Sequence, residues 1–282
     1  MKKDPDAKEP LTVRIRRRLH SESENLSDRA KVWWVKLKSE PWPCRDQKFV
    51  VVGCESSGTT IISHLLLNTG DLRFLLEGQQ TWVWEALQRI YRGESTIREY
   101  PKLQLYDAWK VPGFAAILPQ IVDSFPNIRI VYVVRDPRDV VESAFRTWKV
   151  KDRAGLANIP WVSSTWLGIE AQDPIVRLAS RWRRYMEISR ALSNIEYLRY
   201  EDFCQNKVAC ILDLSKRLGI QVNEDIVRAR CDLQASSRVT RDYAPKGIET
   251  WKNGVLTEED LRLIEETCSD EMQAWGYLQC GI

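Results

Sequence analysis

Residues 53–60 combine glycines with hydroxyl side chains between two apolar segments. They read G-C-E-S-S-G-T-T, after the apolar run 49–52 and before a helical pattern that starts near Ile61. A glycine-rich loop between a strand and a helix N-terminus presents backbone N–H groups to phosphate. The nucleotide loop G-x-x-x-x-G-K-[ST] adds a lysine for the β- and γ-phosphates, and Thr59 occupies that position here. The loop therefore predicts a nucleotide whose reacting group is not a γ-phosphate.

A second candidate anion site follows the β-branched run 128–134, which predicts a buried parallel strand. The run continues into R-D-P-R-D (135–139), where Pro137 suits the first position of a helix. The planar guanidinium of Arg135 matches a phosphate group, and Ser143 adds a hydroxyl further along the same helix. A surface ion pair that caps a helix is the alternative, favoured only if this segment stood without the loop at 53–60.

Alternating strands and helices must place these loops at strand ends. We expect strands at 48–52, 128–134 and 195–200, and helices at 61–68, 114–125, 174–192, 207–218, 224–230 and from Thr257 onward. Parallel strands joined by helices predict an α/β fold, a three-layer sandwich with a central parallel sheet.

The length of 282 residues suits one large domain with a small appendage. We interpret residues 1–45 as an N-terminal arm and residues 46–282 as the domain. Within the domain, the polar stretch 151–174 carries Trp161 and Trp166 and is long enough for a functional lid. Tryptophans in the arm suit either packing onto the domain, the favoured interpretation, or docking on a membrane surface.

Composition excludes several classes of partner and site. The formal net charge is only +3, so no global field calls for a nucleic acid. Seven cysteines without a C-x-x-C pair, together with two histidines, make a metal site unexpected and favour reduced thiols in the cytoplasm. We find neither a secretory leader pattern nor an apolar run of membrane-spanning length, and we expect no transmembrane segment.

Two motifs together resemble the sulfotransferases that use 3′-phosphoadenosine 5′-phosphosulfate (PAPS). The S-G-T-T at 57–60 is similar to the family's 5′-phosphosulfate loop, and residues 135–143 are similar to its 3′-phosphate motif R-[DN]-P-x-D-x-x-x-S. Further matches are K-V-P at 110–112, Y-E-D at 200–202, and K-G followed by W-K-N within 246–253. The resemblance covers most of the chain beyond the first 45 residues and is nearest to the bacterial and tyrosylprotein-like branch.

The resemblance implies a P-loop-like sulfotransferase fold that moves a sulfuryl group from PAPS to an acceptor and releases 3′,5′-phosphoadenosine. No metal belongs to that chemistry. It assigns donor contacts to ten residues: Ser56, Ser57, Gly58, Thr59, Thr60, Arg135, Ser143, Tyr200, Lys246 and Gly247.

Glu77 and Lys110 are the candidate catalytic residues. In the tyrosylprotein-like branch a glutamate past the loop is the base, and an ungapped count from Thr60 places it at Glu77, where apolar neighbours favour a raised pKa. Cytosolic relatives use a histidine, which by spacing falls at Lys110, so we expect this lysine to donate hydrogen bonds to the transferring group instead. A solvated glutamate and a surface lysine are the plain alternatives.

Ser56 departs from the family pattern, which has lysine or arginine at this position. The missing cation leaves three possibilities: Lys110 and the loop amides act alone, activity is low, or another basic residue such as Arg138 or Lys252 replaces it.

The acceptor is expected to be a small molecule with a hydroxyl or amine, and a cationic alkaloid of specialised metabolism is one candidate. Six tryptophans near the motifs suit a planar or cationic acceptor if some of them line its cleft alongside Glu77, Glu85 or Asp107, although most are expected in the core. Two alternatives stay open: a non-catalytic adenosine-phosphate-binding protein and a P-loop kinase-like phosphotransferase. The sequence specifies neither the acceptor nor an oligomeric state.

Overall fold

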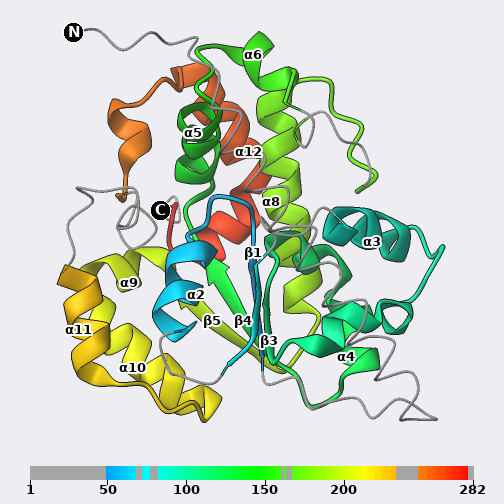
Figure 1. Ribbon diagram of the computed structural model, residues 1–282. Coiled ribbons are helices and arrows are strands. Elements are labelled where there is room, and N and C mark those ends of the chain that lie inside the picture. The colour runs from blue at the N-terminus through cyan, green and yellow to red at the C-terminus, as the bar shows by residue number, and fades with distance from the viewer. Residues whose placement is uncertain are drawn as a thin grey trace, which may run out of the picture.

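The computed structural model describes residues 49–67, 72–76, 82–159, 162, 167–232 and 247–278. A five-stranded, fully parallel sheet forms its centre, with strand order β2-β3-β1-β4-β5 (Figure 1). The strands are β1 (Phe49–Gly53), β2 (Phe74–Leu76), β3 (Ala108–Lys110), β4 (Arg129–Val134) and β5 (Ile195–Arg199). The predicted α/β fold with a central parallel sheet is confirmed.

The strand order reverses between β1 and β4. The chain leaves β1 toward β3 and β2 on one side, and later returns to β4 and β5 on the other. β1 and β4 pair with Gly53 opposite Val133, so both strands end at the same edge. Ligands of open parallel sheets bind at this point, outside the carboxyl ends of the strands. The fold therefore brings the two candidate anion loops side by side.

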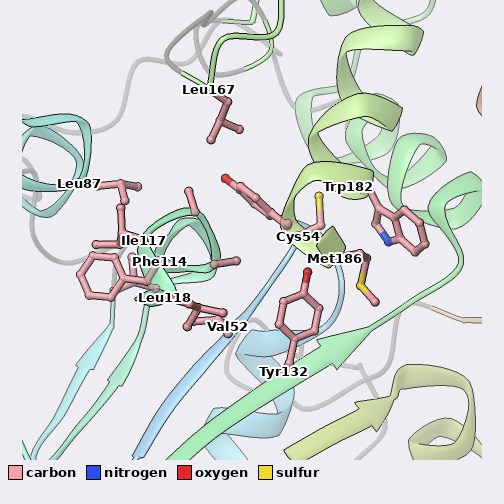
Figure 2. Close-up of a cluster of buried hydrophobic side chains, with 14 of the residues drawn as sticks. Val52, Cys54, Leu87, Phe114, Ile117, Leu118, Tyr132, Leu167, Trp182 and Met186 are labelled. Carbon is pink, nitrogen blue, oxygen red and sulfur yellow. The ribbon is translucent and has the colours of Figure 1, made fainter. Parts of the chain in front are cut away.

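Helices cover both faces of the sheet (Figure 1). One face carries α2 (Thr59–Leu67), α9 (Tyr200–Gln205), α10 (Lys207–Leu218) and α11 (Glu224–Asp232). The other carries α3 (Trp82–Tyr91), α4 (Leu118–Ser124), α5 (Pro137–Trp148), α8 (Pro174–Arg190) and α12 (Glu258–Ala274). Alternate residues of β1 point into different cores, with Val51 on the α2 side and Val52 on the α8 side. Figure 2 shows the second core, where Tyr132 and Cys54 lie beside Trp182 and Met186.

Capping residues fix where the helices begin. The Asp136 side chain accepts from the Arg138 N–H at the start of α5, and Pro137 takes the first turn as predicted. Thr257 and Asp260 form a capping box at the start of α12, where the sequence predicts the beginning of a helix.

Some elements differ from the sequence expectation. The expected helix at 114–125 is a 3₁₀ helix, η4 (Pro112–Ile117), followed by α4, which begins one residue before Pro119. β2, β3 and α3 are not predicted by the sequence patterns. Each of these strands has three residues, too few to show a period of two.

The described part of the stretch 151–174 is anchored. Arg153 in α6 (Arg153–Ala157) forms ion pairs with Asp173 at 2.7 Å and Asp260 at 2.6 Å. Leu156 is fully buried. A lid function stays a prediction, and the arm at 1–45 lies outside the described residues, as do Trp161 and Trp166. Among the described helices, none combines the length and apolarity needed to span a membrane.

Candidate active site

The loop after β1 is a tight turn that leads into α2. The Ser57 N–H donates to the Cys54 carbonyl at 3.0 Å, and Ser56 has φ of +72°, as the third residue of a type II turn requires. Ser57 is fully buried, while Thr59 and Thr60 begin α2. Backbone N–H groups and a helix N-terminus are thereby gathered in one place, as an anion site needs.

Tyr200 packs against this loop at Gly58. Gly58 has φ of +92°, and a Cβ at this position would lie 2.2 Å from the Tyr200 ring. The buried ring also lies 4.6 Å from the Arg135 guanidinium carbon, within cation–π range. The Y-E-D tyrosine thus supports both candidate anion sites.

Arg135 joins the loop after β1 to the segment that starts at Gly247. Its Nη1 donates to the Ser56 carbonyl at 2.8 Å and its Nη2 to the Gly247 carbonyl at 3.0 Å. The side chain is fully buried, and the Trp182 indole donates to the Arg135 carbonyl at 3.0 Å. The structure therefore brings Ser56 and Gly247 to Arg135, although they lie 79 and 112 residues away from it along the chain.

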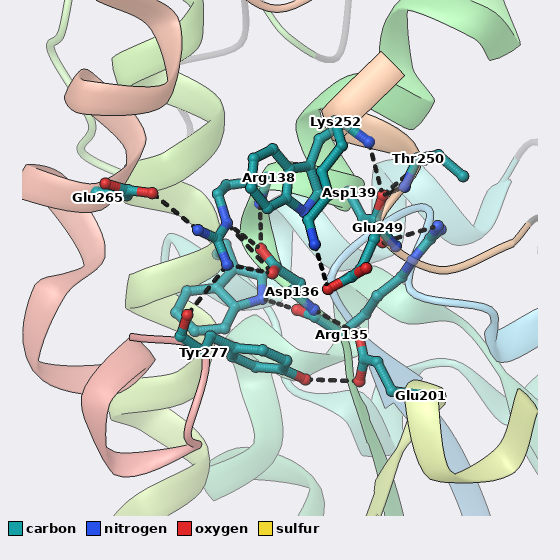
Figure 3. A network of polar contacts seen from close by, with 12 residues as sticks. Arg135, Asp136, Arg138, Asp139, Glu201, Glu249, Thr250, Lys252, Glu265 and Tyr277 are labelled. Atoms are coloured by element: carbon teal, nitrogen blue, oxygen red, sulfur yellow. Dashed lines mark hydrogen bonds and ion pairs between the residues drawn. The ribbon is translucent and has the colours of Figure 1, made fainter. Parts of the chain in front are cut away.

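Asp139 on α5 holds the W-K-N segment (Figure 3). Its carboxylate accepts from the backbone N–H of Glu249 and Thr250 at 2.8 Å each and of Trp251 at 3.2 Å. It also lies 3.7 Å from the Arg135 guanidinium, with both side chains fully buried. A buried carboxylate of this kind is stable only because its lone pairs are satisfied by N–H donors.

Arg138 lies in the same polar network, beside α12 (Figure 3). Its guanidinium contacts Asp136 at 2.7 Å, Glu265 at 2.8 Å and the Tyr277 carbonyl at 3.0 Å. These contacts hold the side chain at the junction of α5 and α12. Arg138 is therefore a structural residue here and does not replace the cation missing at Ser56.

Lys252 likewise pairs with a neighbour on the surface, since its Nζ lies 2.8 Å from Glu249 and the side chain is half exposed.

Glu201 of the Y-E-D motif fixes the end of β4. Its carboxylate accepts from the Asp136 N–H at 3.0 Å and from the Tyr277 hydroxyl at 2.8 Å. Burial raises the pKa of Glu201, and burial also raises the pKa of Asp136. The motif's glutamate thus joins β4 to the C-terminal end of the described chain.

Lys110 ends β3 beside the loop. It pairs in register with Val51 of β1 and Leu76 of β2, and only 6% of it is exposed. It is therefore a buried residue at the carboxyl edge of the sheet, and the plain alternative of a surface lysine is wrong. Glu77 and Lys246 lie outside the described residues, so their assigned roles stay predictions.

Three polar atoms at the two candidate anion sites have no hydrogen-bond partner among the described residues. They are Ser57 Oγ, Ser143 Oγ and Arg135 Nε, all buried. Buried polar atoms normally form hydrogen bonds, and leaving such an atom without a partner costs about 1–3 kcal/mol. The anionic oxygens of a ligand are acceptors of the kind that these three donors lack.

Sequence reasoning missed three residues that build the site. Glu55 lies in the first turn of the loop, Asp139 clamps the C-terminal segment, and Trp182 fixes the Arg135 carbonyl. Asp139 is part of the quoted motif, so its position carried a signal. Trp182 carried only the signal of an apolar helix face, which does not distinguish an indole that donates from one that merely packs.

The family model described as "Sulfotransferase domain" matches residues 46–276. The chain belongs to the sulfotransferase family. No protein of curated function matches it in sequence. Its resemblance to PAPS-dependent sulfotransferases, first drawn from two short motifs, is thereby confirmed.

Solved sulfotransferase structures share the fold. Mouse sulfotransferase SULT7A1, complexed with PAP, is 16% identical, with a TM-score of 0.51 over 81% of this chain and 85% of that one. Sulfotransferase STF9 from Mycobacterium avium is 12% identical, with a TM-score of 0.52 over 92% of this chain and 82% of that one. At these identities the likeness concerns the fold, and the roles of single residues rest on the geometry above.

Proposed function

We propose that this sulfotransferase transfers the sulfuryl group of PAPS to a hydroxyl or amine of a small molecule. The observation that carries the proposal is the set of unsatisfied buried atoms at the ends of β1 and β4: Ser57 Oγ, Ser143 Oγ and Arg135 Nε. Two anion sites at one sheet edge suit a nucleotide with a phosphate on the 3′ side and a phosphosulfate on the 5′ side. The complex of SULT7A1 with PAP, the desulfated donor, supports the same ligand class.

The 5′ end would be bound by the loop. The N–H groups of residues 57–60 and the hydroxyls of Thr59 and Thr60 lie at the N-terminus of α2, where the helix dipole favours negative charge. At the other end, Arg135 Nε and Ser143 Oγ would bind the 3′-phosphate. Arg135 keeps this capacity because its hydrogen bonds to the Ser56 and Gly247 carbonyls use only part of its five N–H donors.

Lys110 would stabilise the charge that moves to the leaving phosphate. Transfer breaks the bond between sulfur and the bridging oxygen while the acceptor oxygen or nitrogen attacks the sulfur. A fixed cation near the loop lowers the barrier, because it favours the charge-separated transition state more than the ground state. Because Ser56 supplies no positive charge, Lys110 matters more here than it would if a second cation lay beside it.

The acceptor is proposed to be a planar or cationic small molecule. Trp82 and Trp84 lie on α3 together with Glu85, and the Trp82 ring stacks on Tyr100 at 6.4 Å. Aromatic faces beside a carboxylate favour cations and flat rings. Trp109 does not contribute, because it is fully buried in the core, and Asp107 is paired with Arg73 at 3.3 Å.

A non-catalytic protein that binds 3′,5′-phosphoadenosine is the second candidate. It is favoured by one observation: Ser56 supplies no cation, and its carbonyl is already bound by Arg135. Such a protein would bind the nucleotide without transferring sulfate.

A thermal-shift comparison followed by a transfer assay tests both candidates. We expect 3′,5′-phosphoadenosine to raise the melting temperature and ATP to leave it unchanged. Incubation with ³⁵S-labelled PAPS and a panel of phenols, alcohols and amines should then yield a labelled product. Stabilisation without any transfer would support the binding protein, and Mg²⁺-dependent hydrolysis of ATP would support a phosphotransferase.

A further inference from the structure

A carboxylate lies in the very loop proposed to hold the phosphosulfate group. Glu55 is the second residue of the turn closed by the Ser57 N–H and the Cys54 carbonyl, and it is partly exposed. Loop amides and a helix N-terminus favour an incoming anion, whereas a fixed carboxylate repels it. Donor binding alone therefore does not explain this residue.

The contacts of Glu55 orient its carboxylate but do not use all of its lone pairs. Its Oε1 accepts from the Tyr185 hydroxyl at 3.5 Å, and its Oε2 faces the Cys54 thiol at 3.8 Å. Both distances are at the long end for hydrogen bonds. A carboxylate offers about four lone-pair positions, so capacity remains for a proton from a substrate.

The ionisable neighbours of Glu55 stay protonated, so they do not act as bases in its place. Burial raises the pKa of Tyr185 on α8, and the Glu55 charge adds to that rise while the Arg181 charge opposes it. Burial likewise raises the pKa of Cys54 on the loop and of Tyr132 on β4. These three groups therefore stay protonated near neutral pH, and Tyr185 remains a donor to the carboxylate.

α8 also places positive charge near this cluster. Arg181 lies one helical turn before Tyr185, is 1% exposed, and acts electrostatically on both Cys54 and Tyr185. Trp182, the next residue, is bound to the Arg135 carbonyl, which fixes α8 against the end of β4. The cluster is therefore part of the same rigid edge as the donor loops.

The sheet order favours Glu55 over a residue that follows β2. β2 is separated from β1 by β3, which puts the ends of β2 and β1 about 10 Å apart across the sheet. Glu55 instead belongs to the loop itself. A general base must come within hydrogen-bond reach of the attacking group, so a loop position has the shorter path.

We propose that Glu55 is the general base of the reaction, oriented by Tyr185; this inference rests on the proposed sulfuryl transfer. The acceptor O–H or N–H gives its proton to Glu55 as its oxygen or nitrogen bonds to sulfur. The bond between sulfur and the bridging oxygen breaks, and its electron pair leaves with 3′,5′-phosphoadenosine. Glu55 afterwards releases the proton to solvent, so no further reactant is needed.

Glu55→Gln keeps the shape and the Tyr185 contact but removes the base. We expect its affinity for 3′,5′-phosphoadenosine, measured by calorimetry, to match the wild type. Sulfate transfer from ³⁵S-labelled PAPS, to a panel acceptor or to water, should fall about 100-fold or more. Glu55→Ala should lose the same activity and regain part of it with added formate, which a structural role would not produce. Glu224→Gln, on the surface of α11, is the matched control and should transfer normally.

Transfer by Glu55→Gln within about threefold of the wild type would overturn the assignment, and a selective loss in Glu77→Gln would then place the base there. Loss of nucleotide binding in both Glu55 variants would overturn it too, because the residue would then shape the loop. Failure of the wild type itself to bind the nucleotide or release label would instead refute the proposed function.

Discussion

The Arg135 guanidinium donates a 2.8 Å hydrogen bond to the Ser56 carbonyl. The contact links the end of β4 to the loop after β1, and the same guanidinium reaches the Gly247 carbonyl at 3.0 Å. The residue proposed to bind the 3′-phosphate therefore also sets the shape of the 5′ loop. Ligand binding at one loop is expected to depend on residues of the other.

Arg135→Lys should weaken the binding of 3′,5′-phosphoadenosine about 100-fold, on the order of 3 kcal/mol, because a lysine cannot replace a fork that serves two carbonyls and a phosphate. Calorimetry with the purified variant measures the loss. Arg98→Lys removes an exposed arginine whose guanidinium donates to the Ser124 carbonyl, and it should bind as the wild type does. Equal affinities of the two variants would contradict the role of Arg135.

Gly58→Ala should abolish nucleotide binding and lower the melting temperature, because its Cβ would lie 2.2 Å from the Tyr200 ring. Gly93→Ala is the control. Gly93 also has a positive φ, of +72°, but a Cβ there would meet no atom within 4 Å. The control should cost only the backbone strain, about 1 kcal/mol, and should leave binding intact. A Gly58→Ala protein that binds normally would show that Tyr200 does not shape the loop.

Asp139→Asn should reduce the free energy of unfolding by about 3 kcal/mol, because it breaks a buried ion pair and turns an amide NH₂ toward backbone donors. Urea denaturation measures the change. Asp123→Asn, an exposed change on α4, should stay within about 0.5 kcal/mol of the wild type. A loss at Asp139 no larger than that of the control would mean that the clamp adds no stability.

Lys110→Met should lower turnover by about two orders of magnitude, the scale of one lost donor to developing charge, with little change in nucleotide affinity. The pair of measurements separates catalysis from binding. A near-normal rate would remove Lys110 from the mechanism.

Glu201→Gln should change how stability depends on pH. Burial raises the pKa of Glu201, so the folded state holds this proton more tightly than the unfolded chain does. The stability linked to the proton is complete below the ordinary value of 4.5 and is lost as the pH rises through the folded pKa.

The variant has no such proton. Its deficit in unfolding free energy relative to the wild type should therefore shrink as the pH rises above about 4.5, as followed by urea denaturation. Asp136, whose pKa shifts in the same direction, is present in both proteins and does not explain a difference between them. A deficit that stays constant or grows with pH would contradict the raised pKa.

The sequence predicted the parts of the fold that carry long periodic signals. β4 and the amphipathic α8 and α12 were placed within a few residues, and the two loops were located from their residue types. β2 and β3 were missed because three residues in a central, doubly covered sheet show no alternation.

The motif letters indicate which residues could bind the donor, but they do not indicate how those residues are held in place. That Arg135 binds Ser56 and Gly247 depends on a strand order that no local pattern encodes. Glu55 was overlooked for the same reason, since its neighbour Tyr185 lies 130 residues further along the chain.

A crystal structure of the complex with 3′,5′-phosphoadenosine tests the central claim most directly. The account predicts the 3′-phosphate within hydrogen-bonding distance of Arg135 Nε and Ser143 Oγ, and the 5′-phosphate on the N–H groups of residues 57–60. A nucleotide bound with its 3′-phosphate away from Arg135, or at another edge of the sheet, would contradict it.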